Sequence, residues 1–257
     1  MDRETKIIAL TGKGGVGKTS ISAVLVKLLA STYPDKRILA IDADPAIGLA
    51  TALGIHPELT LDDIRNEIVS NVEDGKTQEA MELLSESRYK IAEALVERDG
   101  FAFLAIGRPE SAGCYCRINS YLKDVITMIS EQFDYVVIDG EAGIEQINRR
   151  VMERVTHLLL ISDTSKKGLE VTKTIEDVAA ELVKYDRTGL IVNRVEDMSM
   201  VERLDTKGLE LLAAIPSDKE LALYDFEGKD ITGLPEESVV VNKVREAMEK
   251  FGILEEG

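Results

Sequence analysis

The sequence predicts an α/β fold: a doubly wound, mostly parallel sheet with helices on both faces. Three observations support this prediction. Short apolar runs alternate with segments of helical periodicity, as in successive βαβ units. These runs have apolar residues at consecutive positions, which is typical of strands covered on both faces. The first run leads directly into a glycine-rich loop and a helix. Because the chain shows no linker or internal repeat, its 257 residues are expected to form one domain over 1–257.

The expected elements follow one another along the whole chain. Strands are predicted at residues 7–10, 37–41, 101–106, 135–138, 157–162, 190–192 and 211–215, and helices at 20–30, 118–129 and 169–185. A terminal helix is expected to open at Pro235. Residues 55–99 are acidic and helical in pattern with no strand signal. We therefore interpret them as a helical insertion, with Thr60 as a helix N-cap.

Composition narrows the class of protein. Lys and Arg number 31 against 47 Asp and Glu, for a formal net charge of −16. This balance argues against nucleic acid or an anionic lipid surface as the main partner, since both attract basic patches. No apolar run reaches the length of a membrane span, and the N-terminus does not have the pattern of a signal peptide. With two cysteines there is no disulfide framework, so a reducing, cytoplasmic location is expected.

The most specific motif is G-x-x-x-x-G-K-[ST], directly after the first strand. Its residues are Gly12, Lys13, Gly14, Gly15, Val16, Gly17, Lys18 and Thr19. The glycines let consecutive N–H groups turn inward around a phosphate. Lys18 is expected to neutralise the β/γ oxygens and Thr19 to offer its hydroxyl to Mg²⁺. The helix that continues through Ser20 adds its positive dipole end. The motif predicts binding of ATP or ADP with Mg²⁺.

Carboxylates follow two other predicted strands, at the edge of the sheet where ligands gather. Asp42 and Asp44 come after the second strand, and a carboxylate there can orient the attacking water; alternatively, Asp44-Pro45 is an ordinary turn opener. Asp139 ends the strand at 135–138 and is placed to hold Mg²⁺ through water. In the segment that follows, the Gly143 N–H is a candidate donor to the γ-phosphate.

The two cysteines, Cys114 and Cys116, lie one residue apart, just before the predicted helix at 118–129. A disulfide between them would be strained, and burial as small hydrophobic side chains is an alternative. Arg117 and the helix N-terminus favour thiolates, and hence a metal or cluster site. In extended chain both sulfurs point the same way, so a two-fold dimer would offer four thiolates to one ion. Such ligands suit Ni²⁺, Zn²⁺, Cu(I) or an iron–sulfur cluster, and the residues alone select none of them.

The second lysine of the loop gives a resemblance to a known class. The G-K-G-G-V-G-K-T loop resembles the deviant P-loop of the MinD, Mrp, ParA and nitrogenase iron protein class. That class implies that Lys13 reaches the partner's nucleotide across a dimer interface, as an arginine finger does. The alternative is a solvated lysine in a flexible loop. The class also implies that Asp44 positions the attacking water.

The same resemblance suggests a base pocket. Asn193 matches the position where the class reads adenine with an amide, and Pro216 and Ser217 are expected on the other side of the base. Asn and Pro are also common turn residues at strand ends. His56 and His157, the only histidines, are expected to be structural or solvated rather than metal ligands.

With the Cys114-x-Cys116 motif added, the chain resembles the CooC family over nearly its whole length. That family comprises nickel-handling ATPases that mature carbon monoxide dehydrogenase, with relatives that serve acetyl-CoA synthase. The resemblance implies a nucleotide-dependent homodimer that holds Ni²⁺ or Zn²⁺ between its cysteine pairs. ATP hydrolysis would open the dimer and release the metal to a client nickel enzyme. The acidic insertion departs from the family pattern and leaves the client undefined.

Two other functions compete with this interpretation. One is a positioning ATPase like MinD or ParA, but residues 249–257 are too acidic for a lipid-binding helix and the net charge disfavours DNA. The other is an iron–sulfur cluster carrier or electron-transfer ATPase, which uses cysteines in other arrangements. We therefore expect neither nucleic acid nor membrane as a partner.

Overall fold

The computed structural model describes residues 5–108, 116–141, 147 and 151–255. These residues form an eight-stranded sheet in the order β3-β4-β2-β5-β1-β6-β7-β8. The pairings are parallel, except that the edge strand β3 runs antiparallel to β4. The predicted α/β fold with a mostly parallel sheet is confirmed. The strands are β1 (Lys6–Gly12), β2 (Ile38–Asp42), β3 (Val96–Arg98), β4 (Phe101–Ala105), β5 (Tyr135–Asp139), β6 (His157–Ser162), β7 (Arg187–Val195) and β8 (Leu211–Pro216).

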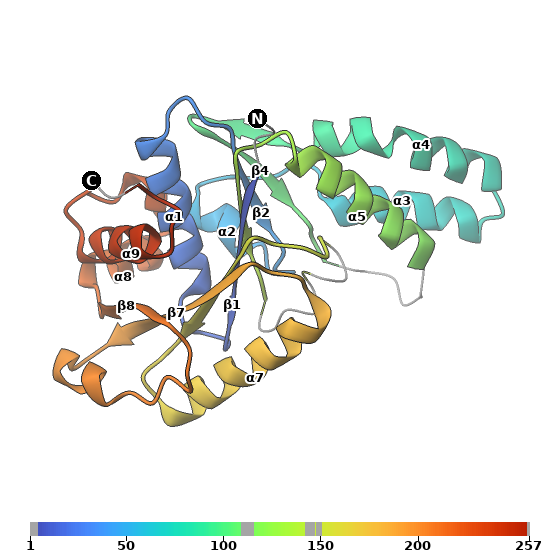
Figure 1. Cartoon of the computed structure of the whole chain (residues 1–257). Coiled ribbons are helices and arrows are strands. Elements are labelled where there is room, and N and C mark those ends of the chain that lie inside the picture. The colour runs from blue at the N-terminus through green and yellow to red at the C-terminus, as the bar shows by residue number, and fades with distance from the viewer. Residues whose placement is uncertain (1–4, 109–115, 142–146, 148–150, 256–257) are drawn as a thin grey trace.

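Helices cover both faces of the sheet (Figure 1). One hydrophobic core lies between the sheet and α1, α2 and α9, and the other between the sheet and α3, α5 and α7. Strand residues alternate between the two cores: Ile8 and Leu10 pack into the first and Ala9 into the second. The helices are α1 (Lys18–Thr32), α2 (Gly48–Ala52), α3 (Leu61–Glu73), α4 (Thr77–Glu93), α5 (Cys116–Ser130), α7 (Lys166–Leu182), α8 (Lys219–Glu227) and α9 (Val239–Lys250), with short 3-10 turns η1 (Met198–Arg203) and η2 (Ile231–Gly233).

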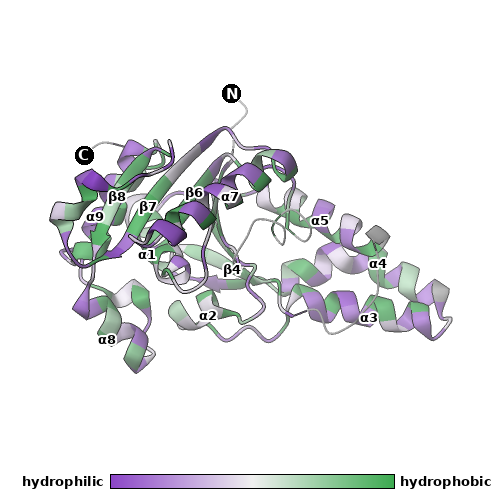
Figure 2. Ribbon diagram, turned by 90° about the horizontal axis from the view of Figure 1, so that it is seen from below, coloured by the Kyte–Doolittle hydropathy of each residue, from purple (hydrophilic) through white to green (hydrophobic). Residues whose placement is uncertain are grey.

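The segment 55–99 contains the helical pair α3 and α4, which projects to one side of the sheet in both ribbon views (Figures 1 and 2). Thr60 caps α3 as predicted, in a capping box in which its side chain and that of Asp63 each accept a backbone N–H. The prediction of no strand here is wrong, because Val96–Arg98 forms β3. Three residues, two of them charged, give no apolar run, and β3 exists because its backbone pairs with the edge of β4.

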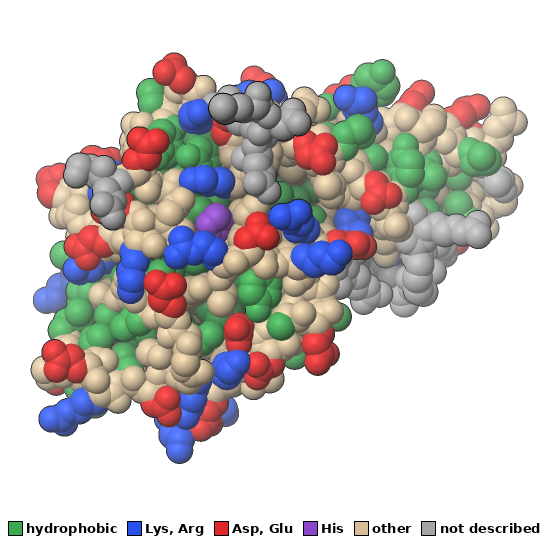
Figure 3. Space-filling view, in the orientation of Figure 1, with side chains coloured by type: hydrophobic (Ala, Val, Ile, Leu, Met, Phe, Trp, Pro, Cys, Tyr) green, Lys and Arg blue, Asp and Glu red, His purple; other side chains and the backbone are tan. Residues whose placement is uncertain are grey.

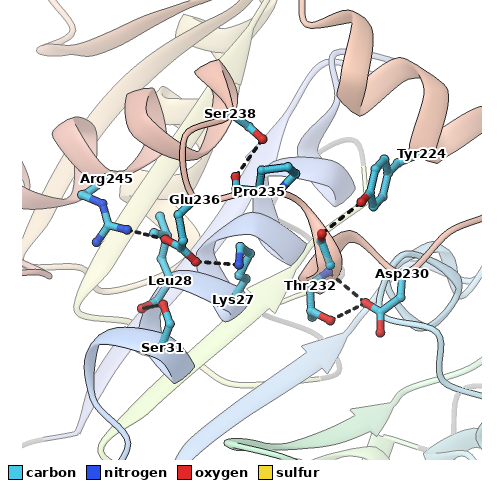
Figure 4. A network of polar contacts seen from close by, with 11 residues as sticks. Lys27, Leu28, Ser31, Tyr224, Asp230, Thr232, Pro235, Glu236, Ser238 and Arg245 are labelled. Carbon is cyan, nitrogen blue, oxygen red and sulfur yellow. Dashed lines mark hydrogen bonds and ion pairs between the residues drawn. The ribbon is translucent and has the colours of Figure 1, made fainter.

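A polar network fastens the C-terminal segment to α1 (Figure 4). Glu236 accepts hydrogen bonds from Lys27 of α1 at 2.6 Å and from Arg245 of α9 at 2.8 Å. The Tyr224 hydroxyl of α8 donates to the Gly233 carbonyl at 3.0 Å. Helices α1 and α9 are thus joined at the surface as well as through the core.

Four helices begin elsewhere than predicted: α1 at Lys18, α5 at Cys116, α7 at Lys166 and α9 at Val239. Helix α9 begins at Val239, because Pro235 lies in a turn whose carbonyl accepts hydrogen bonds from the Ser238 amide and hydroxyl. Helix α5 begins at Cys116 rather than at 118, since no helix-breaking residue separates the two positions. Cys116 is therefore helical, whereas Cys114 lies outside the described residues, so the common direction of the two sulfurs stays a prediction. Within the described ranges, no helix has the length and apolar composition to cross a bilayer.

Candidate functional site

The phosphate-binding loop lies at the carboxyl edge of the sheet, where β1 passes into α1. A Cβ on Gly12 would lie 2.1 Å from the Ile161 carbonyl oxygen of β6, so only glycine fits there. Gly17 has a φ of +90°, and a Cβ on it would lie 2.6 Å from the Asn193 side chain. The sequence-predicted glycines therefore let the loop pack closely against β6 and β7.

Lys18 lies across the mouth of this loop. Its Nζ donates to the Lys13 carbonyl at 3.1 Å and lies 3.5 Å from the Gly12 carbonyl oxygen. Burial lowers the pKa of Lys18, and the charges of Asp139, Asp44 and Glu141 oppose that shift. The Lys18 ammonium can exchange these backbone carbonyls for phosphate oxygens as hydrogen-bond acceptors, as its predicted role requires.

Asp139 ends β5 beside the start of α1 and is fully buried. It accepts hydrogen bonds from the Thr19 hydroxyl at 2.8 Å and from the Ser22 hydroxyl at 2.9 Å. Burial raises the pKa of Asp139 to about 6, against the opposing effect of these two hydroxyls and of Lys18. Mg²⁺ prefers oxygen ligands, and a hydroxyl beside a carboxylate at the P-loop fits that ion. The structure thus brings together Thr19 and Asp139, the two residues predicted to hold it.

Asp42 lies beside Asp139, its register partner on the neighbouring strand. Burial, with the nearby charge of Asp139, raises the pKa of Asp42 to about 7. Its carboxylate accepts hydrogen bonds from the Leu49 and Ala50 amides of α2 at 2.8 and 3.1 Å and from the Asp44 amide at 3.1 Å. Asp42 therefore positions the turn that carries Asp44, and its contact with a nucleotide stays a prediction.

Asp44 itself is half-buried in that turn. One of its carboxylate oxygens accepts the Ala46 amide at 2.8 Å, and its charge acts on both Lys18 and Asp139. The structure thus places Asp44 within the electrostatic reach of the P-loop, as its predicted role requires. Gly143 lies outside the described residues.

Lys13, the second lysine of the loop motif, forms an ion pair within its own chain. Lys13 Nζ lies 2.8 Å from Asp163 Oδ2, and each side chain remains about one-third exposed. Asp163 also accepts the Ser165 amide at 3.0 Å, at the N-cap of α7. The sequence analysis did not identify Asp163 as a site residue. Its position offered a signal, because it directly follows β6, which pairs with β1.

The predicted base-binding residues also meet. A cavity of about 240 Å³ beside the loop is lined by Asn193, Pro216 and Ser217, together with Gly17, Ser20, Arg194, Ile215, Asp218, Leu221, Ala222 and Asp225. The buried Asn193 amide donates to the Val16 carbonyl at 2.8 Å, which ties the loop to β7. Arg194 donates to the Gly15 carbonyl at 2.9 Å, and Ser20 lies 3.5 Å from Asp225. The sequence analysis missed Arg194 and Asp225, since only the fold brings them to the loop.

The structure describes only one of the two cysteines that are predicted to bind the metal. Cys114 lies outside the described residues, and Cys116 is the first residue of α5. Among the described residues, no group of three or more His, Cys, Asp or Glu side chains could hold a metal ion.

Comparison with known proteins identifies the family. Residues 7–231 match the family CbiA, described as the CobQ/CobB/MinD/ParA nucleotide binding domain. The chain belongs to this family. Together with its relatives, the match makes it a P-loop ATPase of the MinD/ParA type. The phosphate contacts of Lys18 and the loop glycines stay predictions, and both lie within the matched residues.

Relatives of two kinds are similar along most of the chain. An uncharacterized ATP-binding protein of Methanocaldococcus jannaschii is 40% identical over 249 residues, which cover 95% of this chain and 98% of the relative. The carbon monoxide dehydrogenase accessory protein CooC of Rhodospirillum rubrum is 28% identical over 233 residues, which cover 86% and 87%. Among solved structures, MinD of Pyrococcus horikoshii complexed with Mg-ADP has a TM-score of 0.69 at 22% identity and covers 96% of each chain.

Proposed function

We propose that this chain, as one ATPase domain, is an ATP-dependent metallochaperone. It binds nickel at the interface of a homodimer and supports nickel insertion into carbon monoxide dehydrogenase or acetyl-CoA synthase. The observation that carries the proposal is the Cys114-x-Cys116 motif in a chain similar to CooC along 86% of its length. Nickel is the cargo, and zinc is the competing ion for the same thiolates.

The nucleotide site supports a hydrolysis cycle. Lys18 and the loop N–H groups would bind the phosphates, and Thr19 with Asp139 would hold Mg²⁺, which neutralises charge that develops on the phosphate oxygens. Asp44 would orient the attacking water, in a turn already fixed by Asp42. Lys13 would leave Asp163 and reach the nucleotide of the partner subunit.

The cycle would couple to the metal through the dimer. ATP needs only to bind the closed dimer more tightly than the open one to drive closure. Closure would bring the cysteine pairs of two subunits together, because a two-fold axis places the same residues opposite each other. Hydrolysis would then loosen the interface and release the ion.

The decisive test is nickel binding by the Cys114→Ser/Cys116→Ser variant, measured anaerobically with a non-hydrolysable ATP analogue. We expect stoichiometric nickel binding to disappear while ATP affinity stays unchanged. His56→Gln is the matched control, since it removes an exposed imidazole, a group that commonly binds metal ions, outside the cysteine pair. Unchanged nickel affinity in the double cysteine variant would refute the proposal that the chain is a metallochaperone.

A MinD-like positioning ATPase is the second candidate. The chain is 24% identical over 235 residues to the septum site-determining protein MinD of Bacillus subtilis. One observation weighs against a membrane role for the last residues: Phe251, Ile253 and Leu254 are buried in the core beside α9. ATP-dependent sedimentation with anionic liposomes would favour this candidate. Failure to sediment, together with nickel binding, would exclude it.

A further inference from the structure

A second cavity lies at the opposite edge of the sheet from the nucleotide site. Ile38 and Phe101, the first residues of β2 and β4, line it, whereas the P-loop follows the last residue of β1. The cavity has a volume of about 620 Å³, within the range of ligand-binding pockets. Its apolar lining includes Leu95, Ile129 and Phe133. It is therefore a pocket with a hydrophobic floor that is remote from the phosphates.

Positive charge gathers around this pocket in a strongly acidic chain. Lys36, Arg37, Arg88 and Arg98 line it with one acidic residue, Glu97. Within the described part of the chain, the side chains of Lys36, Arg37 and Arg88 pair with no carboxylate, whereas Arg98 lies 3.5 Å from Asp230. The Arg37 guanidinium lies 4.9 Å from the centre of the Phe133 ring, and its backbone N–H donates to Asp134. By contrast Lys90, two residues beyond Arg88, pairs with Glu67 at 2.6 Å. Unpaired cations at one pocket favour a ligand with negative charge.

An exposed strip of α4 continues from the pocket. Met81, Ser85, Arg88 and Ala92 are spaced to share one helical face, with Tyr89 beside them, and all five are exposed. Met81 is 68% and Tyr89 72% exposed. The strip runs roughly 16 Å from Met81 to Ala92, from the helical rise. Apolar side chains are visible over this projecting end in Figure 3. The glutamates of α4 at 82, 86 and 93 border the strip on the side of Tyr89, whereas the row from Met81 to Ala92 contains no acidic residue.

We propose that this pocket and strip bind an acidic segment of a partner protein. An aromatic or aliphatic side chain of that segment enters the pocket against Phe101 and Ile129, while its carboxylates pair with Lys36 and Arg88. A protein segment fits better than a small anion, because a molecule inside the pocket would leave Met81 uncovered. The surface needs neither nucleotide nor metal, so the inference goes beyond the proposed function and stands apart from it.

The test is a selection of random twelve-residue peptides displayed against the full-length protein. We expect the enriched sequences to combine Asp or Glu with Phe, Tyr, Trp or Leu. Synthetic copies should bind Lys36→Ser/Arg88→Ser at least tenfold, and Tyr89→Ser at least fivefold, more weakly than the wild type. Lys167→Ser/Arg203→Ser removes two other exposed cations, and Phe226→Ser removes another exposed aromatic ring; both should bind as the wild type does. Unchanged affinity for an ATP analogue shows that each variant is folded.

Three outcomes would overturn the inference. Enrichment without acidic residues would remove its electrostatic basis. Equal binding to the wild type and to Lys36→Ser/Arg88→Ser would place the peptides elsewhere. Self-association without nucleotide that Tyr89→Ser abolishes, seen by sedimentation velocity, would make the occupant a second copy of the chain.

Discussion

The sites at the two edges of the sheet differ in how many of their charged side chains have partners within the chain. At the carboxyl edge, charged groups of the site already have partners within the chain: Lys13 pairs with Asp163, Lys18 is held by loop carbonyls, and two hydroxyls hydrogen-bond to Asp139. At the amino edge, Lys36 and Arg88 pair with no described carboxylate. The first edge is preorganised for a ligand that must displace internal contacts. The second presents charge directly to the surface.

The largest effect, on ATP hydrolysis, should come from Lys18→Ala at the carboxyl edge of the sheet. The variant loses the ammonium that is predicted to bind the phosphates, so ATP hydrolysis should fall at least about 100-fold. Phosphate release at saturating ATP measures this. Lys27→Ala, on the outer side of α1 and paired with Glu236, is the control and should hydrolyse ATP normally. Activity within tenfold of the wild type would show that Lys18 is not a phosphate ligand.

Asn193→Ala should weaken ATP binding by about tenfold or more. The change leaves the Val16 carbonyl without its donor, which costs on the order of 1–3 kcal/mol, and removes an amide from the cavity that is predicted to bind the base. Fluorescent ATP titration measures the affinity. Asn242→Ala is the matched control, because its exposed side-chain amide donates to the Glu237 carbonyl at 3.2 Å, on the surface. Equal affinities of the two variants would exclude a role of Asn193 in holding the loop.

His157, which begins β6 at the amino edge, should make stability depend on pH. Burial, with the charges of Lys6 and Arg187, lowers the pKa of His157 from 6.5 to about 4. The folded state keeps the ring neutral while the unfolded state binds a proton, so stability is lost as pH falls from 6.5 towards 4. When the pH is lowered from 7 to 4.5, the free energy of unfolding of His157→Gln should fall by about 2 kcal/mol less than that of the wild type. Urea unfolding at both pH values measures it. Identical losses would contradict the assignment.

A smaller effect is expected from Asp163→Asn, which releases Lys13. The pair is partly exposed and worth about 0.5 kcal/mol in each of the two subunits, so nucleotide-dependent dimerisation should tighten by about fivefold. Sedimentation velocity with a non-hydrolysable ATP analogue measures this. Asp177→Asn is the control, because it breaks a lysine pair on the outside of α7. Weaker association than the wild type would mean that Asp163 supports the dimer instead of restraining Lys13.

The smallest effect is expected from a double variant at the amino edge of the sheet. Lys36→Ser/Arg88→Ser removes side chains that pair with no carboxylate in the described structure, so the unfolding free energy should stay within about 0.5 kcal/mol. Chemical denaturation tests this. A larger loss would show that these cations stabilise the fold, and the contrast between the two edges would disappear.

Local signals predicted most of the elements and much of the site. The strands at 135–138 and 157–162 were identifiable because continuous apolar residues record burial on both faces. Thr60 was identifiable as an N-cap because its side chain bonds to a residue three positions away. The short strand β3 had no such signal, since Val96–Arg98 is a strand only by virtue of its neighbour β4. Cys116 was expected in extended chain but is helical.

The sequence by itself determined the glycine-rich loop, the lysine and threonine that follow it, and the carboxylates at the ends of two strands. Those features depend on residues close together in the chain and on the general geometry of parallel sheets. Tertiary structure alone decided that Lys13 meets Asp163, 150 positions away, and that Asn193, 177 positions from Val16, secures the loop. It also decided that unpaired cations from separate elements surround one pocket. Such contacts depend on which strands become neighbours, and no local pattern of residues records that choice.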